Sequence, residues 1–133
     1  MDDSGVAELV LDGLGLTGAV PAEVWRLSAL RKFSLRRNQL TSLPAEIGQL
    51  ASLTELNLFG NQLTSVPAEI EQLASLEVLD LRINKLTILP VEIGQLTSLE
   101  RLWLHDNQLT SVPAVMRDLE AEVKVDGCVT VDE

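Results

Sequence analysis

The chain has 133 residues, of which 46% are hydrophobic and 3% aromatic, and its formal net charge is −10. The length indicates one domain with an aliphatic core, and the acidic charge argues against binding to nucleic acids or to anionic membranes, which would repel it. No apolar run is long enough to cross a membrane, and the single cysteine excludes an internal disulfide, so we expect a soluble, cytoplasmic protein.

The sequence repeats itself with a period of 23 residues. All five prolines keep this spacing, from Pro21 to Pro113, and so do four asparagines, from Asn38 to Asn107. The units begin near residues 6, 30, 53, 76 and 99. Such a period predicts a solenoid of stacked units, because a single unit cannot bury its own apolar residues.

The common pattern of the units is L-x-x-L-x-L-x-x-N-x-L-x-x-[LV]-P-x-x-[IM]-x-x-L, and it resembles the pattern of leucine-rich repeat proteins. The unit length and the P-x-E-I-x-x-L half are similar to the intracellular Ras-group type. The resemblance covers roughly residues 6–121 and implies an α/β solenoid. It also implies a short curved parallel sheet on the concave face, short helical turns on the convex face, and one domain spanning residues 1–133.

The first unit departs from this pattern. Leu14 replaces the asparagine, and one extra residue beside Gly18 makes the unit 24 residues long, as in the plant receptor type that it resembles. The five residues before Val6 are too few to cover a strand, so its edge is either open or completed by a partner, a second copy or an upstream region. Trp25 is expected to shelter this N-terminal end.

Each half of the unit predicts one element. The L-x-L segment alternates with period two, which indicates a short strand with one inward face. The asparagine after it offers a donor and an acceptor to buried backbone groups, so we expect a ladder of asparagines along the array. The proline suits the start of a short helix. Glutamates near the positive end of the helix dipole are interpreted as capping and solubilising residues, not as a cation site: Glu23, Glu46, Glu69 and Glu92.

The last residues break the repeat. Val123–Val125 and Cys128–Val131 flank Asp126-Gly127, a pattern typical of a β-hairpin with a two-residue turn. We expect residues 122–133 to form a β-hairpin that caps the array.

No catalytic or cofactor motif is present. His105 and Cys128 are the only residues of their kinds, and they are too few to make a zinc site by themselves. The sequence has no phosphate-binding glycine loop and no nucleophile elbow. We therefore expect a protein without enzymatic activity, metal or cofactor.

The resemblance implies that variable residues between the strand leucines line the concave face and bind partners. These residues include five basic and five acidic ones, so this face is neutral and the rest of the chain carries the net charge. They form four columns: Glu8, Lys32, Glu55, Val78 and Arg101; Val10, Ser34, Asn57, Asp80 and Trp103; Asp12, Arg36, Phe59, Arg82 and His105; and, beside the third, Gly13, Arg37, Gly60, Ile83 and Asp106.

Two of the four aromatic residues, Phe59 and Trp103, fall in these columns, and Phe59 is expected between Arg36 and Arg82. Aromatic residues and arginine are enriched in interface hot spots. In the alternative, Phe59 packs under the arginines without a partner, and Trp103 packs under the hairpin. The predicted partner-binding residues are Arg36, Asn57, Phe59, Asp80, Arg82, Arg101, Trp103 and His105.

The sequence thus favours a module that binds another protein or a peptide through the concave face. The alternative is a structural subunit that docks into a larger assembly through its N-terminal edge or its acidic convex face. Self-association through that edge is a further expectation. Substitution of the concave aromatic residues distinguishes the two functions.

Overall fold

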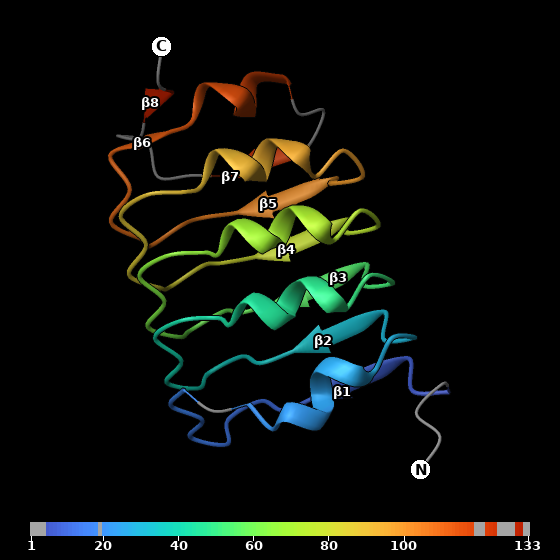
Figure 1. The fold of residues 1–133 in the computed structure, drawn as a ribbon. Helices are drawn as coiled ribbons and strands as arrows, with labels where there is room; N and C mark the ends of the chain where they lie inside the picture. The colour runs from blue at the N-terminus through green and yellow to red at the C-terminus, as the bar shows by residue number, and fades with distance from the viewer. Residues whose placement is uncertain (1–4, 19, 119–121, 125–129, 132–133) are drawn as a thin grey trace.

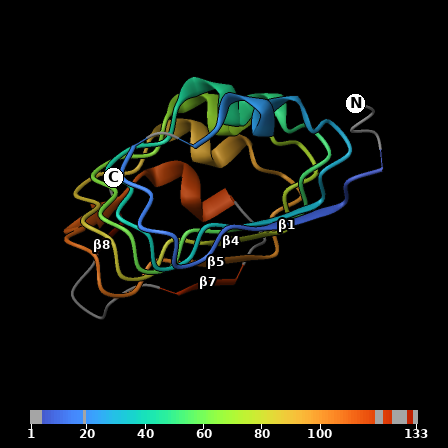
Figure 2. The ribbon, with the colours of Figure 1, turned by 90° about the horizontal axis from the view of Figure 1, so that it is seen from below.

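A computed structural model describes residues 5–18, 20–118, 122–124 and 130–131. The chain winds as a solenoid, with strands stacked on one side, short helices on the other, and the two termini at opposite ends (Figure 1). Viewed along the solenoid, the strands and the helices form two layers with the core between them (Figure 2). The predicted solenoid is confirmed.

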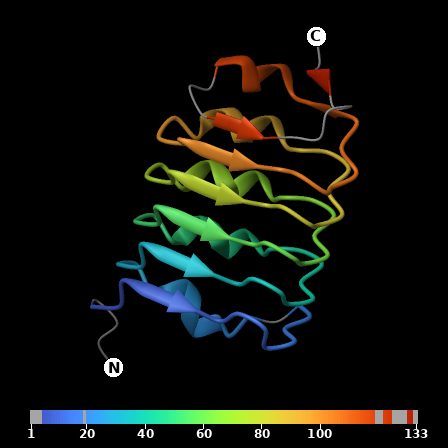
Figure 3. The same ribbon diagram turned by 180° about the vertical axis from the view of Figure 1, so that it is seen from behind.

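The main sheet lies on the concave face and consists of six parallel strands in the order β1-β2-β3-β4-β5-β7 (Figure 3). Neighbouring strands pair in the register of the repeat, so that Leu56 of β3 lies opposite Phe33 of β2 and Leu79 of β4. The strands are β1 (Glu8–Val10), β2 (Lys32–Ser34), β3 (Glu55–Asn57), β4 (Val78–Asp80), β5 (Arg101–Trp103) and β7 (Glu122–Lys124).

Short 3-10 helices form the convex layer, and each is bounded by the signals seen in the sequence. Pro44, for example, lies at the N-cap of its helix, and its carbonyl accepts the N–H of Ile47 at 3.1 Å. Ile47 and Leu50 then turn inward and are fully buried. No helix of the described residues has the length and apolar character needed to cross a membrane. The helices are η1 (Ala22–Arg26), η2 (Ala45–Gln49), η3 (Ala68–Gln72), η4 (Val91–Gln95) and η5 (Ala114–Asp118).

The asparagine ladder is confirmed. The Oδ1 atom of Asn84 accepts the N–H of Leu63 at 3.0 Å, and its Nδ2 donates to the carbonyls of Leu58 at 3.0 Å and Leu81 at 3.1 Å. Leu58 and Leu63 belong to the preceding unit, so each asparagine ties its own unit to the one before. Equivalent bonds are made by Asn38, Asn61 and Asn107.

The N-terminal end of the core is less well covered than the middle. Leu9 of β1 is only partly buried, whereas its counterparts Leu56 and Leu79 are fully buried. Val10 is 64% exposed and Leu14 60% exposed. The first unit tolerates Leu14 because the asparagine at this position bonds to a preceding unit, and β1 is the end of the sheet among the described residues.

Trp25 shelters this end of the core, as expected. It is 7% exposed and lies edge-on to Phe33, with ring centroids 6.3 Å apart. The equivalent position in two other units is a glycine, at Gly48 and Gly94. The indole therefore fills space at the end of the array, where no preceding helix packs against η1 among the described residues.

The predicted C-terminal hairpin is wrong. β7 pairs in parallel with β5, and β8 (Thr130–Val131) pairs in parallel with β6 (Ser111–Val112), so the two strands do not pair with each other. The turn expected at Asp126-Gly127 lies outside the described residues. The register places Val123 opposite Leu102, 21 residues earlier, so the fifth unit is two residues shorter than the units before it and β7 begins a further unit.

The Asp-Gly pair has a different explanation in that phase. In each of the four units with the asparagine, the residue before it has a positive φ, between 55° and 74°. Gly13, at the equivalent position of the first unit, also has a positive φ. Only glycine adopts such a φ without steric cost. Gly127 follows in the same phase as Asp106, and Cys128 in the phase of Asn107, where the repeat accepts either asparagine or cysteine. By its place in the sequence, the glycine thus matches this repeat position.

Candidate functional site

The predicted partner-binding residues belong to the concave side, on strands β3 to β5 and at the second position after each of strands β2 to β5. Asn57, Asp80 and Trp103 occupy the same register position on β3, β4 and β5. Arg101 begins β5 and is exposed, and His105 follows the strand and is half-buried. The structure therefore brings residues from four consecutive units onto one surface.

Phe59 lies at the centre of a group of arginines. The Cζ atoms of Arg36, Arg37 and Arg82 are 5.2, 5.3 and 5.0 Å from the centre of its ring. Arg82 also lies over Trp103, at 4.9 Å. At these distances a guanidinium is attracted to the face of an aromatic ring. We call Arg36, Arg37, Phe59, Arg82 and Trp103 the arginine–aromatic stack.

The stack confirms that Phe59 lies between Arg36 and Arg82. Arg37 was not among the predicted site residues, because it precedes the asparagine rather than continuing the strand. The residue at the equivalent position of the next unit is Gly60. A Cβ atom at Gly60 would lie 3.6 Å from Arg37, so the two positions are in contact.

Asp80 was predicted to face a partner, but the structure buries it. Its carboxylate is 1% exposed and accepts hydrogen bonds from the Nε of Arg82 at 3.0 Å and the Nη2 at 2.7 Å. The backbone N–H of Arg82 donates to the same carboxylate at 3.1 Å. The hydrogen bond to Asp80, together with its negative charge, raises the pKa of Arg82. Asp80 therefore positions Arg82 between the two rings rather than contacting a partner.

Asn57 has a related role in the neighbouring unit. Its Oδ1 accepts the N–H of Phe59 at 3.1 Å, which is the bond that Asp80 makes to the N–H of Arg82. Asn57 is half-buried, and among the described residues its side chain does not bind an arginine as Asp80 does. The side chain at this register position thus fixes the backbone of the residue that enters the stack.

The stack has positive charge that the chain does not neutralise. Among the described residues neither Arg36 nor Arg37 makes an ion pair. The Nε of Arg36 is shielded from solvent and has no hydrogen-bond partner in the described chain. Only Arg82 is held by a carboxylate, so two of the three guanidiniums remain available to an acidic group.

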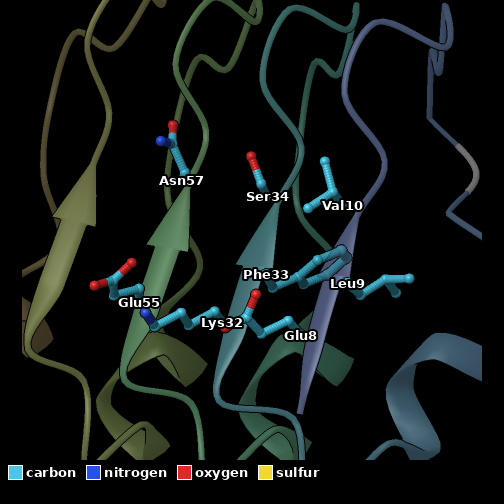
Figure 4. A pocket seen from close by; sticks show the side chains of 8 residues that line it. All are labelled: Glu8, Leu9, Val10, Lys32, Phe33, Ser34, Glu55 and Asn57. Atoms are coloured by element: carbon cyan, nitrogen blue, oxygen red, sulfur yellow. The ribbon is translucent and has the colours of Figure 1, made fainter. Parts of the chain in front are cut away.

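A shallow hollow of about 190 Å³ continues the concave face toward the N-terminal end. Figure 4 shows Lys32 between Glu8 and Glu55 at one end of the strands, and a second row at the other end formed by Val10, Ser34 and Asn57. This volume is below the range typical of small-molecule sites. It suits single side chains of a larger partner.

The described residues of this surface offer few side chains that could act in catalysis. Within the described part of the chain, no three histidine, cysteine, aspartate or glutamate side chains lie close enough to hold a metal ion. His105 is the only histidine, and Cys128 lies outside the described residues. The expectation that the protein has no enzymatic activity stays a prediction.

Comparisons with known proteins identify the architecture. The profile of a family described as "Leucine-rich repeat region" matches residues 9–122. A search of curated proteins finds no significant match. Many solved structures have the same fold, and the similarity extends over almost all of this chain.

Three of these structures illustrate the range. A leucine-rich repeat protein of Leptospira interrogans is 36% identical, with a TM-score of 0.82, over 96% of this chain and 38% of its own. The Arabidopsis thaliana BIR3–SERK2 complex contains a chain that is 28% identical, with a TM-score of 0.74, over 94% of this chain and 69% of its own. The ectodomain of the receptor kinase GASSHO1/SCHENGEN3 of the same plant, in complex with CASPARIAN STRIP INTEGRITY FACTOR 2, is 36% identical over 97% of this chain and 15% of its own, with a TM-score of 0.78.

Proposed function

The chain belongs to the leucine-rich repeat proteins, and from this we propose that it is a non-enzymatic module that binds a protein or peptide through its concave face. Proteins of this fold commonly serve in protein–protein interaction, and two of the similar structures are complexes with a protein or peptide factor. The chain spans only 38% of the similar Leptospira protein and 15% of the GASSHO1/SCHENGEN3 ectodomain. The partners of those proteins are therefore not carried over to this one.

The arginine–aromatic stack is the observation that carries the proposal. Phe59 and Trp103 lie on the solvent side of the sheet, and each is only half-buried there. Part of each side chain is therefore open to a partner. The guanidinium groups of Arg36 and Arg37 make no ion pair within the described residues, although the backbone N–H of Arg36 donates to Asp12 Oδ1 at 2.8 Å. A partner with an apolar side chain beside a carboxylate would cover the rings and neutralise the cations, which are the contacts that dominate interface hot spots.

The second candidate is a subunit that docks into a larger assembly through the open N-terminal edge. Leu14 favours it, because this side chain is 60% exposed beside β1, which pairs only with β2 among the described residues. Unpaired strand edges with apolar neighbours readily accept another strand. Self-association would use the same edge.

The expected location in the cytoplasm remains part of the proposal, together with the similarity to the intracellular Ras-group repeats. It rests on the single cysteine and on the 23-residue units. Plant receptor ectodomains with the same fold are among the similar structures.

The test is affinity capture from cell extract, with the wild type beside a Phe59→Ser/Trp103→Ser variant and read by mass spectrometry. We expect specific partners of the wild type to be lost from the variant, because truncation of a hot-spot residue weakens binding by about 2 kcal/mol or more, roughly 30-fold. Thermal unfolding of both proteins verifies that the variant is folded.

A Leu14→Ser variant is the control at the N-terminal edge, because Leu14 is 60% exposed there and lies outside the concave columns. It should retain the partners if the concave face binds them. Loss of the partners from this edge variant, with retention by the concave variant, would support the assembly subunit and contradict the proposed function.

A further inference from the structure

Three residues on the convex side depart from the repeat, and all three depart toward more apolar side chains. Ile88 stands where the second, third and fifth units have serine. Val91 stands where all four other units have alanine, and Val115 where the four preceding units have glutamate. Because the units are otherwise nearly identical, the chain itself shows that the fold does not require these residues.

The three side chains gather at one place. They line a groove of about 500 Å³ beside β6, where the segments that lead into η4 and η5 lie next to each other (Figure 1). Leu89 and Pro113 form part of its floor. We call this surface, defined by Ile88, Leu89, Val91, Pro113 and Val115, the convex groove.

Core packing does not explain the substitutions. Ile88 is 66% exposed and Val91 61% exposed, so neither buries much of its surface in the fold. Val115 is 37% exposed and rests on Gly94, where a Cβ atom would lie only 2.8 Å from it. Exposed apolar side chains that cluster in this way are a mark of a binding surface.

The charges beside the groove indicate what kind of partner fits it. The helices η2, η3 and η4 contain four glutamates and neither lysine nor arginine. Glu46, Glu69 and Glu92 occupy equivalent positions on successive, mutually packed helices, and Val115 ends this row. None of the three glutamates makes an ion pair among the described residues.

A second copy of the chain would be a poor occupant. It would bring two rows of carboxylates and two chains of net charge −10 against each other. A cationic segment meets no such repulsion, and its charges would complement the glutamate row. Its apolar side chains would enter the groove at the end of that row.

We propose that the convex groove binds a basic amphipathic segment of another protein, with aliphatic side chains on Ile88, Val91 and Val115 and with lysine or arginine side chains along the glutamate row. This binding is independent of the concave face, which lies on the opposite layer of the solenoid (Figure 2).

The test is an Ile88→Ser/Val91→Ala/Val115→Glu variant, which restores the residues of the other units and so should fold as the wild type does. The probe is a fluorescein-labelled helical peptide of leucine and lysine, roughly 14 residues long, with leucines on one face. We expect fluorescence anisotropy to show at least about tenfold weaker binding to the variant than to the wild type. A peptide with glutamate in place of lysine should bind to neither protein.

The variant separates groove binding from general attraction to an acidic protein. Val115→Glu makes the surface more negative, so a purely electrostatic attraction would strengthen binding to the variant. Equal or tighter binding of the leucine–lysine peptide by the variant would overturn the proposal. So would light scattering that shows a wild-type dimer and a monomeric variant, since the occupant would then be a second copy. The Phe59→Ser/Trp103→Ser variant should bind the peptide as the wild type does, so the two proposals fail separately.

Discussion

Replacement of Asn84 by leucine is expected to lower the free energy of unfolding by about 1–3 kcal/mol. Leucine has nearly the same size, so the change leaves no cavity. It leaves the buried N–H of Leu63 without its partner. The carbonyls of Leu58 and Leu81 each lose one of two amide donors and keep the other, from Asn61 and Asn107. Each buried backbone group left without a partner costs about 1–3 kcal/mol. Because Asn84 joins two units in the middle of the array, the loss should appear in the cooperative unfolding of the whole chain.

Urea unfolding followed by circular dichroism measures this effect. Leu14→Asn is the matched control, because it places the same side chain at the equivalent position of the first unit, where no earlier unit offers groups to bond among the described residues. It should change stability by no more than about 0.5 kcal/mol. An unchanged midpoint for Asn84→Leu would contradict the ladder as the connection between units.

Replacement of Asp80 by alanine is expected to cost about 2 kcal/mol of stability. The carboxylate accepts three hydrogen bonds from Arg82, two from the guanidinium and one from the backbone. Hydrogen bonds to charged groups contribute about 1.5–3 kcal/mol. Because the side chain of Arg82 is 36% exposed, water partly replaces the lost contacts, which places the expected cost at the lower end.

Asp80→Asn should cost less than about 1 kcal/mol, because an amide keeps the acceptor for the N–H of Arg82. Asn57 makes the same bond to Phe59 in the neighbouring unit. Both variants release the guanidinium of Arg82, so both should weaken capture of a partner by the concave face. Equal destabilisation by alanine and asparagine in urea unfolding would show that the backbone bond contributes little.

The repeat made most of the fold predictable. Identical spacing of leucine, asparagine and proline placed strands β1 to β5 and the helices, and the chemistry of an amide placed the ladder. Phe59, Arg36 and Arg82 were predictable as neighbours because equivalent residues of adjacent units lie side by side in a solenoid. These inferences needed only the period and the alternation of side chains along a strand.

Features that depend on a single unit were not predictable in this way. Asp126-Gly127 has the local signature of a hairpin turn, but the pairing of β7 with β5 shows that the phase of the repeat prevails over that signature. The period places Asp80 on the concave face, but not under Arg82, because the ion pair depends on the side chain two residues later. Val115 was visible as a departure from the repeat, but its position beside Ile88 requires the geometry of the convex layer.

A photo-crosslinking experiment tests most directly whether partners bind to the concave face. Benzoylphenylalanine is placed either at Glu55, which is exposed on β3, or at Gln49, which is exposed on η2 two units away from the convex groove. We predict that the partner lost from the Phe59→Ser/Trp103→Ser variant crosslinks from position 55 and not from position 49. Crosslinking of that partner from position 49 alone would place it on the convex side and contradict the account.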